Sequence, residues 1–319
     1  MSKRTSFVCF QILFCIAGFS QKKIHHYVFF AHERERIHEK DFLKNATIEG
    51  AQLKYFWREL EPQKDQYDFS SIEKDLAFLY SKGKKLFIQI QDVTFDTQYK
   101  AVPGYLRQSG VVIQYHIDDN DSLIKQAGWI AKRWDTAVAN RFFKLVELLG
   151  KAFDGKIAGI NFDETAMEAG STGKHYPPGF TPLVYKNAII EYMRAGKKAF
   201  QRSPFMLFAN FMPGDYLKDI YAFAAENNIA MGGPDIKVYK PFQMLNSYPL
   251  LKKYGDRIFT GQAVQDGNLE EINPKTGKQV TVEEVYSFAK DYLNLDYIFW
   301  GTQEPYYSEK VLPFLKKLK

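Results

Sequence analysis

Residues 157–165 read Ile-Ala-Gly-Ile-Asn-Phe-Asp-Glu-Thr, an apolar run that ends in the adjacent carboxylates Asp163 and Glu164. A short apolar run bounded by polar residues is typical of a strand that is buried on both faces of a parallel sheet. The carboxyl ends of such strands form the edge at which barrel and open-sheet α/β enzymes place their chemistry. The segment therefore predicts a buried strand that carries two acids to a functional rim.

Seven other short apolar runs share this character, and amphipathic helical patterns lie between most of them. With the run at 157–162 included, the runs span residues 26–30, 51–57, 86–91, 157–162, 205–211, 229–233, 257–264 and 297–300. The helical patterns span residues 70–81, 138–153, 184–201, 216–227, 282–293 and 308–318. Eight β–α units predict a single (β/α)8 TIM barrel, an α/β fold with a parallel sheet. A doubly wound open sheet is the alternative, which the lack of a Gly-rich loop after the early strands disfavours.

Two connections are long for a compact barrel. Residues 92–135 follow the third predicted strand and contain a hairpin pattern at 111–115, and residues 166–183 follow the fourth strand. Both segments leave the carboxyl ends of strands, so we expect them to form ordered lids above the functional rim.

The N-terminal residues have the pattern of a secretory signal. Lys3 and Arg4 precede an apolar stretch at 7–19, and Gly18 and Ser20 are small residues suited to signal peptidase. Residues 1–20 are therefore predicted to be a signal peptide and residues 21–319 the barrel catalytic domain, in the periplasm or outside the cell. An N-terminal membrane anchor is the alternative. We expect no membrane insertion of the mature chain.

Composition narrows the chemistry that the barrel can perform. Both cysteines, Cys9 and Cys15, fall in the predicted signal, so disulfides and thiolate chemistry are not expected in the barrel. The net charge is +6, but basic residues are interleaved with acids, which disfavours a nucleic-acid partner. The six histidines form no H-E-x-x-H pattern, so neither a metal nor a cofactor is predicted. The oligomeric state stays open.

Polar and aromatic side chains gather at the predicted strand ends. Besides Asp163 and Glu164, they are Trp57, Arg58, Gln91, Asn210, Asp235, Gln262, Asp266, Trp300 and Glu304. Amides and carboxylates hydrogen-bond to sugar hydroxyls, Trp rings stack on sugar faces, and a carboxylic acid with a carboxylate cleaves glycosidic bonds. This set of side chains at the strand ends therefore predicts a carbohydrate substrate. Because successive strand side chains alternate, we expect one of Asp163 and Glu164 to face the interior and the other to support it.

The segment at 56–69 reads Phe-Trp-Arg-Glu-Leu-Glu-Pro-Gln-Lys-Asp-Gln-Tyr-Asp-Phe. It resembles the W-x-x-x-E-P-x-x-x-x-Y-D-F connection between strand two and its helix in barrel glycoside hydrolases of the beta-galactosidase and cellulase superfamily. The resemblance implies a (β/α)8 fold with an acid/base at the end of strand four, which is Glu164 here, preceded by Asp163 where Asn is usual. It also implies a nucleophilic Glu at the end of strand seven, where this chain has Gln262.

We therefore hypothesise a secreted glycoside hydrolase with Glu164 as proton donor. Asp235 and Glu304 are candidates for the second catalytic carboxylate, and Asp266 is a substitute if strand seven extends further. Substrate binding is assigned to Trp57, Arg58, Gln91, Asp163, Asn210, Gln262, Asp266 and Trp300.

Two other classes of function compete with this hypothesis. A catalytically inactive barrel that binds carbohydrate is motivated by Gln262 at the implied nucleophile position. A metal-dependent deacetylase or a polysaccharide lyase is disfavoured because the ligand pattern is missing. A second carboxylate within reach of Glu164 would favour the hydrolase over the binding protein.

Overall fold

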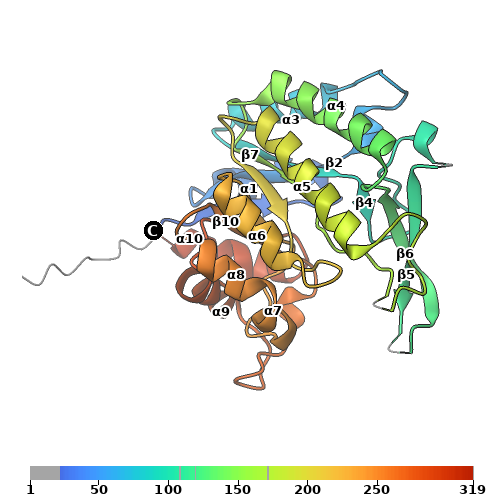
Figure 1. The fold of residues 1–319 in the computed structure, drawn as a ribbon. Coiled ribbons are helices and arrows are strands. Elements are labelled where there is room, and N and C mark those ends of the chain that lie inside the picture. The colour runs from blue at the N-terminus through green and yellow to red at the C-terminus, as the bar shows by residue number, and fades with distance from the viewer. Residues whose placement is uncertain (1–21, 108, 119, 171, 319) are drawn as a thin grey trace, which may run out of the picture.

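The computed structural model describes residues 22–107, 109–118, 120–170 and 172–318, so the predicted signal at 1–20 lies outside the described residues. Eight parallel strands close into a barrel in the order β1-β2-β3-β7-β8-β9-β10-β11 and back to β1 (Figure 1). They are β1 (His25–Phe29), β2 (Ile48–Phe56), β3 (Lys85–Gln91), β7 (Gly159–Phe162), β8 (Phe205–Phe208), β9 (Ala230–Gly233), β10 (Thr260–Val264) and β11 (Tyr297–Gly301). The predicted (β/α)8 barrel is confirmed.

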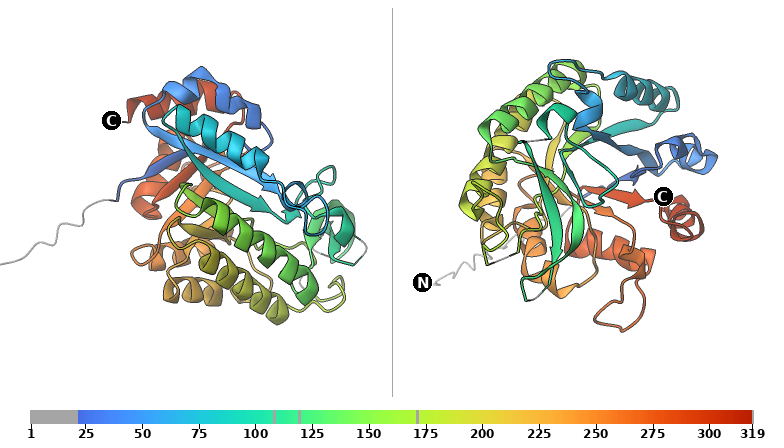
Figure 2. Two further views of the ribbon diagram at one scale, coloured as in Figure 1. Left: turned by 90° about the horizontal axis from the view of Figure 1, so that it is seen from above. Right: turned by 90° about the vertical axis from the view of Figure 1, so that its right-hand side faces the viewer.

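Helices surround the barrel on its outside (Figure 2). They are α1 (Lys40–Lys44), α2 (Trp57–Leu60), α3 (Ser70–Ser81), α4 (Thr136–Phe153), α5 (Pro182–Ala199), α6 (Leu217–Glu226), α7 (Pro241–Leu245), α8 (Ser247–Tyr254), α9 (Val282–Ser287) and α10 (Leu312–Lys317). Two π-helical turns, Phe288–Tyr292 and Tyr307–Val311, continue α9 and lead into α10. Every predicted helical pattern is thus helical, with small shifts at the ends.

Local side chains set where several of these helices begin. The Asp135 carboxylate accepts hydrogen bonds from the backbone N–H groups of Ala137 and Val138 at the start of α4. Thr281 and Glu284 form a capping box at the start of α9. The strand β10 begins later than its apolar run, because residues 257 and 258 still donate backbone hydrogen bonds to the carbonyl of Tyr254 at the end of α8.

The apolar core has two parts. The larger part fills the space between the strands and the helices. The smaller part fills the barrel interior and is mostly aromatic, with Tyr27, Phe29, Phe87, Met206, Phe208, Tyr297 and Phe299. Polar side chains replace the aromatic layer nearer the carboxyl ends of the strands, where Gln52 Nε2 donates to Asn161 Oδ1 at 2.9 Å. The interior therefore becomes polar at the end of the barrel where the site was predicted.

The two long connections pack together over that end. The first contains a three-stranded antiparallel sheet, β4 (Val93–Thr94), β5 (Val111–Ile117) and β6 (Leu123–Ala131), in the order β4-β6-β5. The right-hand view of Figure 2 shows the β5–β6 hairpin lying across the barrel opening. The segment after β7 binds this hairpin, since the Glu168 backbone N–H donates to Gln114 Oε1 at 3.0 Å and the Glu168 carboxylate lies 3.0 Å from His116 Nδ1.

Candidate active site

Asp163 follows β7 and points into the barrel interior, where two glutamines from β3 hold it. Gln91 Nε2 donates to Asp163 Oδ2 at 2.8 Å, and Gln89 Nε2 donates to Oδ1 at 3.3 Å. The same Oδ1 accepts the backbone N–H of Glu164 at 3.0 Å. Burial raises the pKa of Asp163 to about 6, against the opposing charge of Lys54. Asp163 is therefore a buried carboxylate that supports its neighbour.

Asp163 and Glu164 both line one cavity at this end of the barrel. Strand alternation had predicted that only one of the two side chains would face the interior. The alternation ends because β7 stops at Phe162. Burial raises the pKa of Glu164 to about 8, with further contributions from the negative charges of Asp163 and Asp235. Among the described residues, no hydrogen bond to the Glu164 carboxylate is found. At neutral pH this carboxyl is mostly protonated and free to donate its proton.

A buried arginine fixes the backbone beneath Glu164. Arg133, which follows β6, donates from Nε and Nη2 to the two carboxylate oxygens of Asp92 at 2.9 and 2.5 Å. Its Nη1 donates to the backbone carbonyl of Glu164 at 2.9 Å and to the Tyr185 hydroxyl at 3.0 Å. One guanidinium thus joins the ends of β3, β6 and β7 to α5.

Lys54 brings a positive charge to the cavity wall, and the sequence analysis missed it. It lies on β2 on the same face as Gln52, and its Nζ lies 5.1 Å from the centre of the Phe29 ring. Burial lowers the pKa of Lys54, whereas Asp163, Glu164 and Asp266 oppose that effect. The available signal was the pair of polar residues spaced by two in an otherwise apolar strand.

The cavity at Glu164 has a volume of about 190 Å³. It is lined by His32, Lys54, Gln89, Gln91, Thr94, Phe95, Asp96, Tyr99, Asp163, Glu164 and Gln265. The His32 ring stacks on Tyr99 with centroids 4.0 Å apart and planes 5° apart, and Phe56 lies 6.0 Å from Tyr99. Apolar ring faces beside carboxylates and amides are the combination that carbohydrate sites need.

Asp235 follows β9 and lies close enough to Glu164 to raise its pKa. Asp235 Oδ1 accepts from Asn268 Nδ2 at 2.8 Å, and its Oδ2 lies 3.7 Å from Lys237 Nζ. The Tyr248 hydroxyl donates to its backbone carbonyl at 3.3 Å. Asp235 is thus a firmly held second carboxylate at the same end of the barrel.

Glu304, the other candidate for that role, lies in an exposed loop. Its Oε1 accepts from Arg36 Nη2 at 2.7 Å and from the Ser308 hydroxyl at 2.7 Å. These contacts tie the loop after β11 to the segment after β1 and occupy the carboxylate. The negative charge of Asp235 raises the pKa of Glu164, which favours Asp235 over Glu304 as its partner.

The structure contradicts the assignment of Trp57 and Trp300 as sugar-binding residues, because both are fully buried. Trp57 Nε1 donates to Glu61 Oε2 at 2.9 Å, under α4. Trp300 Nε1 donates to His26 Nδ1 at 3.1 Å, and the ring packs in the outer core between strands and helices. The aromatic wall of the cavity is formed instead by His32, Tyr99 and their neighbours.

Gln262 is also buried and does not face the cavity, which contradicts its assignment to substrate binding. Its neighbours Gly261 and Ala263 face the barrel interior, so the Gln262 side chain points away from it. In the amide orientation that satisfies both of its polar atoms, Nε2 donates to the backbone carbonyl of Asp235 at 2.9 Å. Gln262 therefore positions Asp235, and no carboxylate stands at the position where the resemblance implies one.

The remaining predicted residues lie around the opening. Asp266 follows β10, where burial and the charge of Glu33 raise its pKa against the charge of Lys54. Asn210 follows β8, and its buried Oδ1 has no hydrogen-bond partner among the described residues. Arg58 lies on α2 with a partly exposed side chain. Their contacts with substrate stay predictions.

Within the described part of the chain, no group of three or more His, Cys, Asp or Glu side chains is arranged to hold a metal ion. No helix in the same residues is long and apolar enough to span a bilayer.

The barrel is similar to solved structures of glycoside hydrolases. A beta-galactosidase from the Antarctic haloarchaeon Halorubrum lacusprofundi matches with a TM-score of 0.54 and 12% identity, over 87% of this chain and 52% of that one. Xylanase 10B from Thermotoga petrophila, solved with xylobiose, matches with a TM-score of 0.52 and 11% identity, over 87% and 82% of the two chains. A xylanase from Paenibacillus barcinonensis matches with a TM-score of 0.53 and 11% identity, over 87% and 84%.

These likenesses confirm, at the level of fold, the resemblance to barrel glycoside hydrolases. The chain spans about half the length of the haloarchaeal beta-galactosidase. The sequence matches no protein-family model, and no curated protein is significantly similar to it.

Proposed function

We propose that the protein is a glycoside hydrolase in which Glu164 donates a proton to the glycosidic oxygen. The observation that carries the proposal is a carboxyl whose pKa is raised to about 8, in a cavity at the carboxyl ends of the barrel strands. A general acid must hold its proton at the working pH, and burial achieves this for Glu164. The barrel fold shared with xylanases and beta-galactosidases agrees with this chemistry.

Asp235 is the second carboxylate of the proposed reaction. As the bond between the anomeric carbon and the glycosidic oxygen breaks, the leaving oxygen takes the proton of Glu164. Asp235 then either removes a proton from the attacking water or attacks the anomeric carbon itself before water does. The first route inverts and the second retains the anomeric configuration, so NMR of the fresh product distinguishes the two roles of Asp235.

The test is hydrolysis of a broad panel of oligo- and polysaccharides by the wild-type protein and by Glu164→Gln. Glu168→Gln is the matched control, because Glu168 lies four residues further along the same segment and pairs with His116. We expect Glu164→Gln to lose activity with its circular dichroism unchanged, and Glu168→Gln to retain it. Equal activity in wild type and Glu164→Gln would overturn the assignment of the acid.

The alternative is a barrel that binds carbohydrate without cleaving it. It is favoured by Gln262, since the strand-seven carboxylate implied by the resemblance is missing. The proximity of Asp235 to Glu164 argues against it. Binding of a glycan by wild type without release of reducing ends would establish this alternative.

Export is a further part of the proposal and rests on the signal pattern at 1–20. Expression of the whole chain in a bacterial host, followed by N-terminal sequencing of the periplasmic and medium fractions, tests it. Cleavage near Ser20 supports export, whereas an intact N-terminus in the cytoplasm contradicts it.

A further inference from the structure

A second, larger cavity adjoins the cavity of Glu164. Its volume is about 400 Å³, and it is lined by Ala31, His32, Arg34, Lys54, Phe56, Glu59, Asp68, Ser70 and Ser71. His32 and Lys54 line both cavities, so these two side chains form the boundary between them. The cavity of Glu164, at about 190 Å³, is smaller than typical small-molecule sites of roughly 300–1,000 Å³. The two cavities together reach that range.

Arg34 is held in place at the wall of the second cavity. Its Nη2 donates to the backbone carbonyl of Lys54 at 2.7 Å. Its Nε lies 3.6 Å from Asp75 Oδ2, and its guanidinium carbon lies 4.5 Å above the Tyr55 ring. Among the described residues, these contacts leave Nη1 without an acceptor. The arginine is thus oriented in advance, which lowers the entropy cost of binding a ligand.

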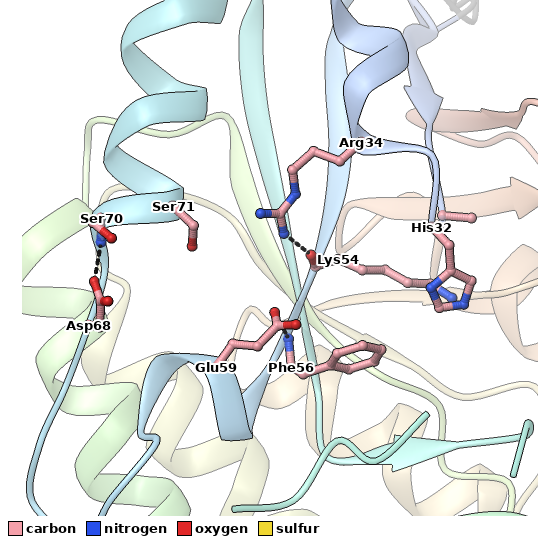
Figure 3. Close-up of a pocket in the computed structure, with 9 residues that line it drawn as sticks. His32, Arg34, Lys54, Phe56, Glu59, Asp68, Ser70 and Ser71 are labelled. Atoms are coloured by element: carbon pink, nitrogen blue, oxygen red, sulfur yellow. Dashed lines mark hydrogen bonds between the residues drawn. The ribbon is translucent and has the colours of Figure 1, made fainter. Parts of the chain in front are cut away.

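Glu59 and Ser71 face the same space as Arg34 (Figure 3). One oxygen of Glu59 accepts the backbone N–H of Phe56 at 3.4 Å, and Asp68 accepts the backbone N–H of Ser70 at 2.9 Å. The wall therefore offers hydrogen-bond donors and acceptors side by side. The two carboxylates offset the positive charges, so the cavity suits a neutral, hydroxyl-rich ligand better than an anion.

We infer that this second cavity binds the next sugar unit of the chain whose bond Glu164 cleaves. The inference rests on the proposed function and deepens it, because it makes the substrate a neutral oligosaccharide of two or more units. The chain passes over His32 and Lys54, and its second ring meets Arg34, Glu59 and Ser71. Binding energy from this remote ring is available to accelerate cleavage at the first cavity.

The test fills the second cavity with a side chain and leaves the first intact. Ser71→Phe places a ring into the cavity, and Ser81→Phe, at the far end of the same helix α3, is the matched control. The probes are β-1,4-linked xylo-, cello- and galacto-oligosaccharides of two to six units, together with the aryl monoglycoside of each sugar. The two readouts are kcat/KM for hydrolysis and, by calorimetry, the affinity of Glu164→Gln with and without Ser71→Phe.

For wild type and Ser81→Phe, we expect kcat/KM to rise by roughly tenfold or more from aryl monoglycoside to longer chains. In Ser71→Phe this rise should disappear while hydrolysis of the aryl monoglycoside stays unchanged. A rise that is the same in Ser71→Phe and wild type overturns the second site and leaves the proposed function standing. If neither these probes nor the broad panel of saccharides is hydrolysed, the proposed function fails. The calorimetry still decides the second site, since an affinity that grows with chain length and is lost in Ser71→Phe supports it.

Discussion

Glu164 and Asp235 follow β7 and β9, the two strands that flank β8, and the negative charge of Asp235 raises the pKa of Glu164. Burial is the main cause that raises the pKa of Glu164 to about 8, and the negative charge of Asp235 contributes to the rise after that of Asp163. An acid kept protonated beside a second carboxylate is the arrangement that glycoside cleavage requires.

Asp163→Asn should move the alkaline limb of the pH profile of kcat/KM to lower pH. The charge of Asp163 raises the pKa of Glu164, so its removal lets Glu164 lose its proton more easily. Wild type should show an alkaline limb near pH 8, where Glu164 deprotonates and the general acid is lost. Asp215→Asn, at an exposed carboxylate paired with Lys218, should leave the limb in place. A limb that does not move in Asp163→Asn would show that another group titrates there.

Lys54→Met should move the same limb in the opposite direction. The positive charge of Lys54 lowers the pKa of both Asp163 and Glu164, so its loss should raise both. The control is Lys85→Met, at the start of β3, where the side chain is exposed and pairs with Glu49. Profiles of kcat/KM against pH measure both variants, and a shift toward lower pH in Lys54→Met would contradict the assigned charge of Lys54.

Arg133→Met should lower the free energy of unfolding by about 3–5 kcal/mol, because it leaves the buried carboxylate of Asp92 without its partner. Urea denaturation followed by circular dichroism measures this loss. The double variant Arg133→Met with Asp92→Asn should recover part of it, because the stranded charge is removed. Lys151→Met, in an exposed pair with Glu147 on α4, should have little effect. A loss in Arg133→Met no larger than in Lys151→Met would contradict the role of the buried pair.

Trp57→Phe and Trp300→Phe should each reduce stability without changing KM. Each substitution removes the indole N–H that binds Glu61 or His26, and the unpaired acceptor costs roughly 1–3 kcal/mol. Denaturation midpoints and steady-state kinetics on the same preparations separate the two effects. An increased KM with unchanged stability would instead support the assignment of these two residues to sugar binding.

The barrel could be predicted because one signal is repeated eight times. Each apolar run is short, each amphipathic stretch has helical spacing, and their order leaves few possible topologies. The ends of the elements depend on local hydrogen bonds that the pattern does not show. Arg257 and Ile258 fall within the predicted strand at 257–264. Their backbone N–H groups nevertheless donate to the carbonyl of Tyr254 at the end of α8.

The sequence located Asp163 and Glu164 at the rim because they end an apolar run. It did not predict whether the other rim side chains point into the barrel or away from it. Both faces of a strand in a parallel barrel are apolar, so the sequence of β11 does not tell which face is inside. Phe299 lies in the interior and Trp300 in the outer core, although either could occupy either face. Arg133 was missed for a different reason, since it reaches Asp92 from 41 residues away.

The dependence of the rate on the leaving group shows whether Glu164 is the proton donor. For the sugar identified by the panel, kcat/KM is compared between wild type and Glu164→Gln on two substrates. One is a dinitrophenyl glycoside, whose dinitrophenolate leaves without being protonated. The other is the natural saccharide, whose leaving oxygen needs a proton. We predict a loss of roughly 10²–10⁴-fold on the saccharide and little loss on the dinitrophenyl glycoside. Equal losses on both substrates, or no loss on the saccharide, would show that Glu164 is not the proton donor.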